Sequence, residues 1–89
     1  MLVLPPELTH RQAAACLRLL LQGLKAERES RVVVDAGALT AFDSSALAVL
    51  LECRRALAQS GKTLAVKAQP PALTSLAGLY GVQELLLSV

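Results

Sequence analysis

The sequence predicts an α/β domain, a mixed sheet of about four strands with three to four helices packed on it. Three observations lead to this prediction. Apolar residues recur at helical spacing in two long segments, a run of valines stands between those segments, and prolines or single glycines mark where each segment stops. A chain of 89 residues is long enough for one hydrophobic core and too short for two, so residues 1–89 are predicted to form a single domain.

The composition supplies a core and excludes several classes of function. Hydrophobic residues make up 54% of the chain and charged residues 18%, which excludes a disordered protein. Only 2% of the residues are aromatic and the net charge is +2, so neither stacking nor charge favours binding to nucleic acid. The longest apolar run, residues 46–51, is far shorter than the ~20 residues of a membrane-spanning helix. We therefore expect a cytoplasmic protein without direct membrane insertion.

The first third of the chain predicts a short strand followed by a helix. Residues 2–4 are apolar and end at Pro5, which cannot donate to a sheet ladder, so they are expected to form an edge or terminal strand. Thr9 is a favourable N-cap for a helix over residues 10–25. The apolar stripe of this helix consists of Ala13, Leu17, Leu20, Leu21 and Leu24.

The middle of the chain predicts a buried strand and a second helix. Residues 31–35 contain three successive valines, a pattern typical of a strand covered on both faces. A loop over residues 36–42 leads to Asp-Ser-Ser at 43–45, whose side-chain oxygens accept hydrogen bonds from the free N–H groups at a helix start. The second helix is predicted over residues 44–59, and Gly61 supplies the left-handed residue that follows it.

The last third predicts a strand, a short helix and a tail. Residues 63–68 alternate in polarity, which predicts a strand with one wetter face. The proline pair at 70–71 ends that strand and opens a helix over residues 71–79, because proline is favoured at the first helical position. Gly81 ends this helix, and residues 82–89 are expected to form either a last strand or a helical tail.

The chain lacks the side-chain patterns of catalysis or metal binding. His10 is the only histidine and has no cysteine or carboxylate at metal-ligand spacing. Cys16 and Cys53 are predicted to be buried free thiols. Asp35 and Asp43 could form a carboxylate pair for acid–base chemistry, but backbone capping explains them equally well. We therefore expect no enzyme activity, no metal and no cofactor.

A resemblance to a known family runs along nearly the whole chain. Residues 32–51 lead from the valine strand through a loop to Asp43-Ser44-Ser45 and an apolar helix, an order that resembles the signature of STAS domains. That family includes the anti-sigma-factor antagonists and the STAS subunit of the Mla phospholipid transporter. Three further segments are similar to its pattern: Pro6-Glu7-Leu8-Thr9, Gly61-Lys62-Thr63-Leu64 and Leu76-Ala77-Gly78-Leu79-Tyr80-Gly81-Val82. The family's N-terminal strand is expected to be missing here, because so few residues precede the first proline.

The resemblance implies a function without catalysis. The short chain and the Leu-Tyr-Gly-Val segment at 79–82 favour the STAS subunit that binds and supports the ATPase of a bacterial Mla-type phospholipid ABC transporter, which maintains outer-membrane lipid asymmetry. Such a subunit would be cytoplasmic and peripheral to the inner membrane through the ATPase and its permease. The alternative is an anti-sigma-factor antagonist that is switched by phosphorylation at Ser44.

Ser44 is the residue to which the resemblance assigns partner binding or phosphorylation. It stands at a helix start, where free N–H groups and the helix dipole favour an anion. Phe42, Asp43 and Ser45 are expected to join it in docking, although Ser44 and Ser45 could instead simply cap the helix.

Leu47 and Leu51 widen the apolar arc of the same helix beyond what one core face needs. They are predicted to contact the partner. The alternative is that both side chains pack under the loops around Leu39 and Phe42.

Overall fold

The computed structural model describes the backbone of residues 2–88 and the side chains of residues 2–86. The order of elements is β1 (Leu2–Val3), β2 (Glu7–Leu8), α1 (His10–Ala26), β3 (Arg31–Asp35), β4 (Ala41–Phe42), α2 (Ser44–Gln59), β5 (Thr63–Lys67), α3 (Pro71–Leu79), a 3-10 turn η1 (Gln83–Leu85) and β6 (Leu87–Ser88). The predicted α/β class is confirmed.

The main sheet has four strands in the order β1-β3-β5-β6. Its centre is the pairing of β3 with β5, which runs from Arg31 opposite Thr63 to Asp35 opposite Lys67. Every pairing among the described residues is parallel, so the expected mixed sheet is corrected to a parallel one. The reason is the connectivity: a helix or a helical turn carries the chain back before each new strand of this sheet.

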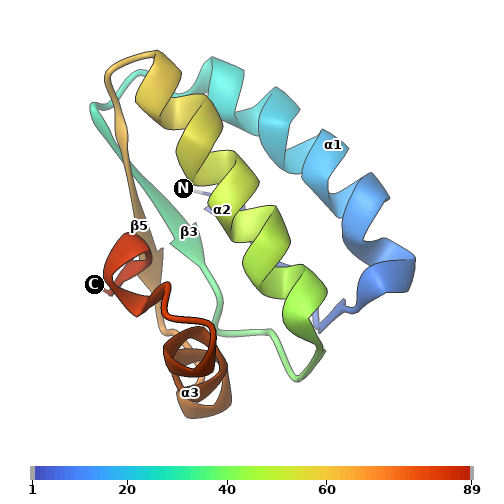
Figure 1. Cartoon of the computed structure of the whole chain (residues 1–89). Coiled ribbons are helices and arrows are strands. Elements are labelled where there is room, and N and C mark those ends of the chain that lie inside the picture. The colour runs from blue at the N-terminus through green and yellow to red at the C-terminus, as the bar shows by residue number, and fades with distance from the viewer. Residues whose placement is uncertain (1, 89) are drawn as a thin grey trace.

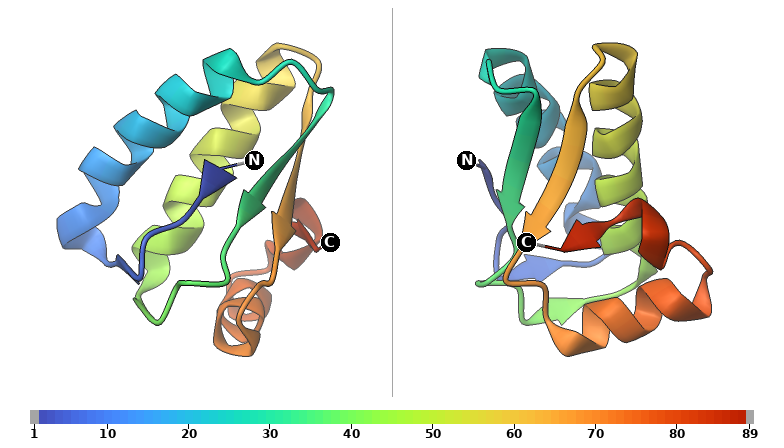
Figure 2. Two further views of the ribbon diagram at one scale, coloured as in Figure 1. Left: turned by 180° about the vertical axis from the view of Figure 1, so that it is seen from behind. Right: turned by 90° about the vertical axis from the view of Figure 1, so that its left-hand side faces the viewer.

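The two long helices lie side by side on one face of this sheet, and α3 lies beyond the carboxyl ends of β3 and β5 (Figures 1 and 2). The prediction that the valine strand is covered on both faces is therefore wrong. Val32 and Val34 point into the core and are 1% and 0% exposed, whereas Val33 on the other face is only half-buried.

The prediction that one face of β5 is exposed to solvent is also corrected in part. Lys67 is exposed, but Ala65 on the same face is 0% exposed, because β5 has a neighbouring strand on each side and the alanine side chain is short.

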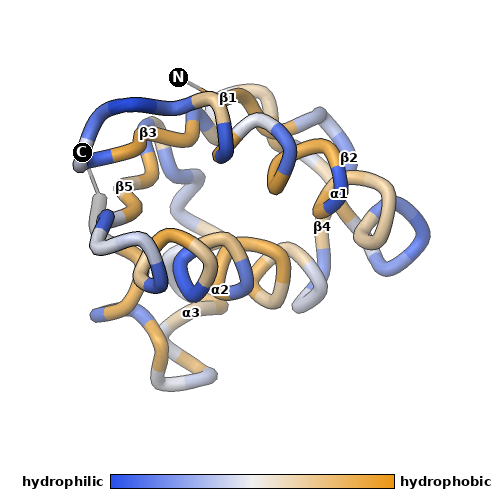
Figure 3. Tube along the Cα trace, turned by 90° about the horizontal axis from the view of Figure 1, so that it is seen from above, coloured by the Kyte–Doolittle hydropathy of each residue, from blue (hydrophilic) through white to orange (hydrophobic). Residues whose placement is uncertain are grey.

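The core lies between the sheet and the two helices, and apolar residues concentrate there along β3, β5 and α2 (Figure 3). Leu50 of α2 is 0% exposed, and Leu20 and Leu24 of α1 are buried opposite α2. Helix α1 begins as predicted, with Thr9 and Gln12 forming a reciprocal capping box. Its end at Ala26 is one residue beyond the predicted one.

Three turn positions adopt a left-handed backbone. Gly61 and Gly81 have φ of 72° and 69°, which glycine adopts without steric cost. Ala68, after β5, has φ of 55°, a conformation that strains a residue with a side chain. Beyond Gly81 the chain forms both η1 and β6, so a strand and a helical turn coexist there; Val89 lies outside the described residues.

Candidate functional site

The segment that leads into α2 is fixed to the segment that leads into α1. The strands β2 and β4 pair in parallel, with Leu8 opposite Phe42, and the Pro6 carbonyl accepts hydrogen bonds from the Thr40 and Ala41 N–H groups at 2.9 and 3.0 Å. The sequence predicted only a loop over residues 36–42, because a two-residue strand leaves no readable alternation. This small ladder places the starts of α1 and α2 next to each other.

Asp43 joins the two helix starts through one carboxylate. Its Oδ1 accepts from the Ser45 N–H at 2.8 Å, which caps α2, and its Oδ2 accepts from the His10 N–H of α1 at 3.2 Å. The hydrogen bond from the Ser45 backbone holds the pKa of Asp43 below its ordinary value, against a smaller opposing effect of desolvation. The carboxylate is therefore ionised at neutral pH and takes the capping role itself.

Ser44 is exposed as the first residue of α2. Its hydroxyl makes no hydrogen bond within the described part of the chain, whereas the Ser45 side chain bonds to Asp43. Capping thus accounts for Asp43 and Ser45 but leaves the Ser44 hydroxyl available to solvent. Whether a partner or a phosphate uses that hydroxyl remains a prediction.

A groove of about 290 Å³ opens beside Ser44, between α2 and the end of α3. We call it the α2–α3 groove. It is lined by Ser44, Leu47, Ala48, Leu51, Tyr80 and Val82. At its α3 side Tyr80 is 60% exposed, and its neighbour Leu79 is 84% exposed. The groove therefore combines a polar helix start with an apolar, solvent-facing end of α3.

The structure separates the predicted docking residues into two groups. Ser44 is exposed, Asp43 and Ser45 are half-buried at the helix start, and all three lie together. Leu47, by contrast, is 3% exposed and belongs to the core, so the prediction that it widens the exposed apolar arc is corrected; it lines only the base of the α2–α3 groove. It is covered because α2 packs between α1, the sheet and α3.

Phe42 and Leu51 are neither fully buried nor fully exposed. Both side chains are half-buried and pack against the core, so each presents only part of its surface. The burial of Leu47 and the partial burial of Leu51 agree with packing inside the chain, and their packing under the loops around Leu39 and Phe42 stays a prediction.

Sequence reasoning missed the α3 side of the groove. Tyr80 and Val82 line that side, and Leu79 is exposed next to them. An apolar residue in the sequence predicts burial, so no local signal marks Tyr80 as exposed. The position of Tyr80 and Val82 in the same groove as Ser44 depends on how α3 packs on α2, which no local pattern reveals. Ala48, exposed one turn after Ser44, was missed for the same reason.

Among residues 2–88 there is no group of three or more His, Cys, Asp or Glu side chains that could hold a metal ion. Cys16 and Cys53 are buried free thiols, as expected, and burial raises the pKa of Cys53 to about 11. No described helix combines the length and the hydrophobicity that crossing a membrane requires.

Comparison with protein families gives a match along the chain. A family model described as Mlab, STAS domain aligns with residues 1–88, which include the capped start of α2 and both sides of the α2–α3 groove. No curated protein matches the chain.

Proposed function

The chain belongs to the family of MlaB-type STAS domains, and we propose that it is the STAS subunit that binds and supports the ATPase of a bacterial Mla-type phospholipid ABC transporter. In this role it has no catalytic activity of its own. It lies in the cytoplasm, peripheral to the inner membrane through the ATPase and the permease of the full complex, and contributes to outer-membrane lipid asymmetry.

One observation supports this proposal most directly. The exposed Ser44, whose hydroxyl makes no hydrogen bond within the described part of the chain, lies at the α2–α3 groove. An apolar centre edged by polar groups is the usual composition of a protein–protein interface. Tyr80 and Leu79 provide large apolar side chains that are exposed in the free chain, and tyrosine is enriched among residues that carry binding energy. The groove is therefore suited to a protein partner.

The proposed mechanism is support of one conformation of the ATPase. A subunit that binds one state of its partner more tightly than another shifts the partner toward that state. Such binding needs a surface that keeps its shape, and Asp43 and the β2–β4 ladder fix the start of α2 against α1. Docking at Ser44 thus costs little ordering of the backbone.

Co-purification of the chain with the ATPase of its own transporter tests the proposal. Ser44→Glu places a charge at the groove and Tyr80→Ala removes its largest exposed side chain, and each is expected to weaken the complex about tenfold or more. Arg28→Gln, an exposed change in the loop between α1 and β3, is the control and should bind as the unchanged chain does. The proposal is wrong if both folded groove variants retain the ATPase as well as Arg28→Gln.

The phosphorylation switch is the second candidate function, and the free Ser44 hydroxyl is what favours it. A phosphate there adds about −1.5 to −2 charges beside the ionised Asp43, so repulsion would expel an acidic partner. Intact mass spectrometry of the protein from its own cells distinguishes the two functions. Phosphate on Ser44 favours the switch, and its absence in every growth condition favours the transporter subunit.

A further inference from the structure

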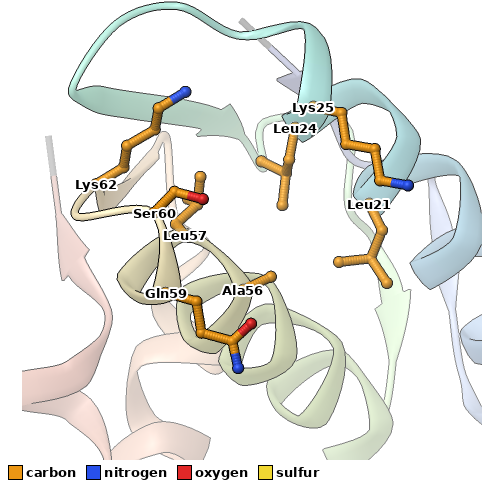
Figure 4. A pocket seen from close by; sticks show the side chains of 8 residues that line it. All are labelled: Leu21, Leu24, Lys25, Ala56, Leu57, Gln59, Ser60 and Lys62. Carbon is orange, nitrogen blue, oxygen red and sulfur yellow. The ribbon is translucent and has the colours of Figure 1, made fainter.

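A second pocket lies at the opposite end of α2 from Ser44. It opens between the last turns of α1 and α2 and the turn into β5, and its volume is about 490 Å³ (Figure 4). Because α2 has 16 residues, the two ends of the helix are about 24 Å apart. We call this cavity the C-terminal pocket. It is lined by Leu21, Leu24, Lys25, Ala56, Leu57, Gln59, Ser60 and Lys62.

The floor of the C-terminal pocket is apolar. Leu21 and Leu24 of α1 face Ala56 and Leu57 of α2 across the gap (Figure 4). Leu24 and Leu57 are 5% and 3% exposed, so they form the base, whereas Leu21 and Ala56 are half-buried and form the walls. A ligand with a hydrocarbon portion can therefore bury that portion between the two helices.

The rim of the C-terminal pocket is cationic. Lys25 and Lys62 stand at opposite edges of the pocket, with the Lys25 ammonium directed away from the gap, and no carboxylate is among the lining residues (Figure 4). The Lys62 ammonium donates a hydrogen bond to the Glu27 carbonyl, just beyond the end of α1, which holds this side chain at the rim. An ammonium has three N–H donors, so this bond leaves others for a ligand.

We propose that the C-terminal pocket binds an amphiphilic anion, with a single hydrocarbon chain on the leucine floor and a carboxylate or phosphate head at Lys62, while Lys25 adds positive charge at the opposite edge. The positive charge of the rim repels a cationic head group. A small hydrophilic anion has no apolar surface that it could bury on the leucine floor, so it gains little from the pocket. The pocket volume falls within the usual range of small-molecule sites, about 300–1,000 Å³. This site goes beyond the proposed function, because the docking groove is at the other end of α2.

Titration of the full chain with decanoate, followed by backbone amide NMR, tests the proposal. Decanoate is expected to shift the amides of the lining residues and to reach saturation. Decyl phosphate has the same hydrocarbon chain with a phosphate head, so comparing it with decanoate shows which head group the site prefers. Saturation by either anion supports the proposal. Decanol keeps the chain without the charge and acetate keeps the charge without the chain, and each should bind more weakly by about fivefold or more.

Three variants locate the site. Lys25→Gln removes one of the two positive charges at the rim and is expected to weaken decanoate binding about threefold, and Lys67→Gln on β5 is the matched control with no change. Ala56→Leu fills the space between the helices and should abolish binding. The inference is overturned if neither anion saturates, if decanol binds as tightly as decanoate, or if Ala56→Leu and Lys25→Gln, both folded, bind like Lys67→Gln.

Discussion

Replacing Ala68 by glycine should stabilise this protein. Ala68 has φ of 55°, and its side chain is exposed, so the mutation removes a methyl group from solvent rather than from the core. A left-handed backbone costs a residue with a Cβ atom about 1–2 kcal/mol, because the Cβ approaches the following carbonyl. Glycine relieves that cost at the same φ.

The gain is reduced by the unfolded state. Glycine makes the unfolded chain more flexible and so lowers stability by about 0.4–1 kcal/mol. The net effect of Ala68→Gly is therefore a rise centred on about 0.8 kcal/mol in the free energy of unfolding, or about 3–6 °C in Tm for a domain of this size.

Thermal unfolding followed by circular dichroism measures this shift. Ala14→Gly is the matched control: it is the same substitution at an exposed site inside α1, where it should cost about 1 kcal/mol and lower Tm. The two variants are thus expected to move Tm in opposite directions. If Ala68→Gly lowers Tm as Ala14→Gly does, the reasoning from the strained backbone is refuted.

Three further predictions concern charge, thiols and packing. Because the folded state lowers the pKa of Asp43, the ionised Asp43 stabilises the fold above pH ~4, and this contribution is lost as the pH falls through the lowered pKa. When the free energy of unfolding is measured against pH, Asp43→Asn should therefore show a smaller decrease in this acid range. Cys53, with a pKa of about 11, stays a neutral buried thiol at pH 8, so an aromatic disulfide reagent should modify it only after denaturation, and rapid modification of the native protein would contradict its burial. Leu50→Ala should lower the free energy of unfolding by about 3–5 kcal/mol in urea titrations, and a loss below about 1 kcal/mol would contradict its central place in the core.

The helices were predictable because their ends carry local signals. The bounds of α2 and α3 agree with the prediction, since Asp43 caps one helix and the proline pair at 70–71 opens the other. The parallel arrangement and the strands β2 and β4 were not predictable. Strand direction depends on long-range connections, and a two-residue strand is too short to show alternation.

The candidate site was predictable only on its α2 side. The Asp-Ser-Ser motif is local, so it marked Ser44 directly. Periodicity places Leu47 and Leu51 on an apolar arc but cannot tell which neighbour covers that arc, and in the structure Leu47 is covered while Leu51 is partly open. Tyr80 reaches the site through the packing of α3, 36 residues further along the chain.

The parallel sheet has a consequence for how the chain reaches its native state. Neighbouring parallel strands cannot be joined by a tight hairpin, and the central pair here is separated by residues 36–62. The entropy of closing that loop must be lost before the first hydrogen bond between these strands forms. Refolding should accordingly be slower than that of a helical bundle of equal length.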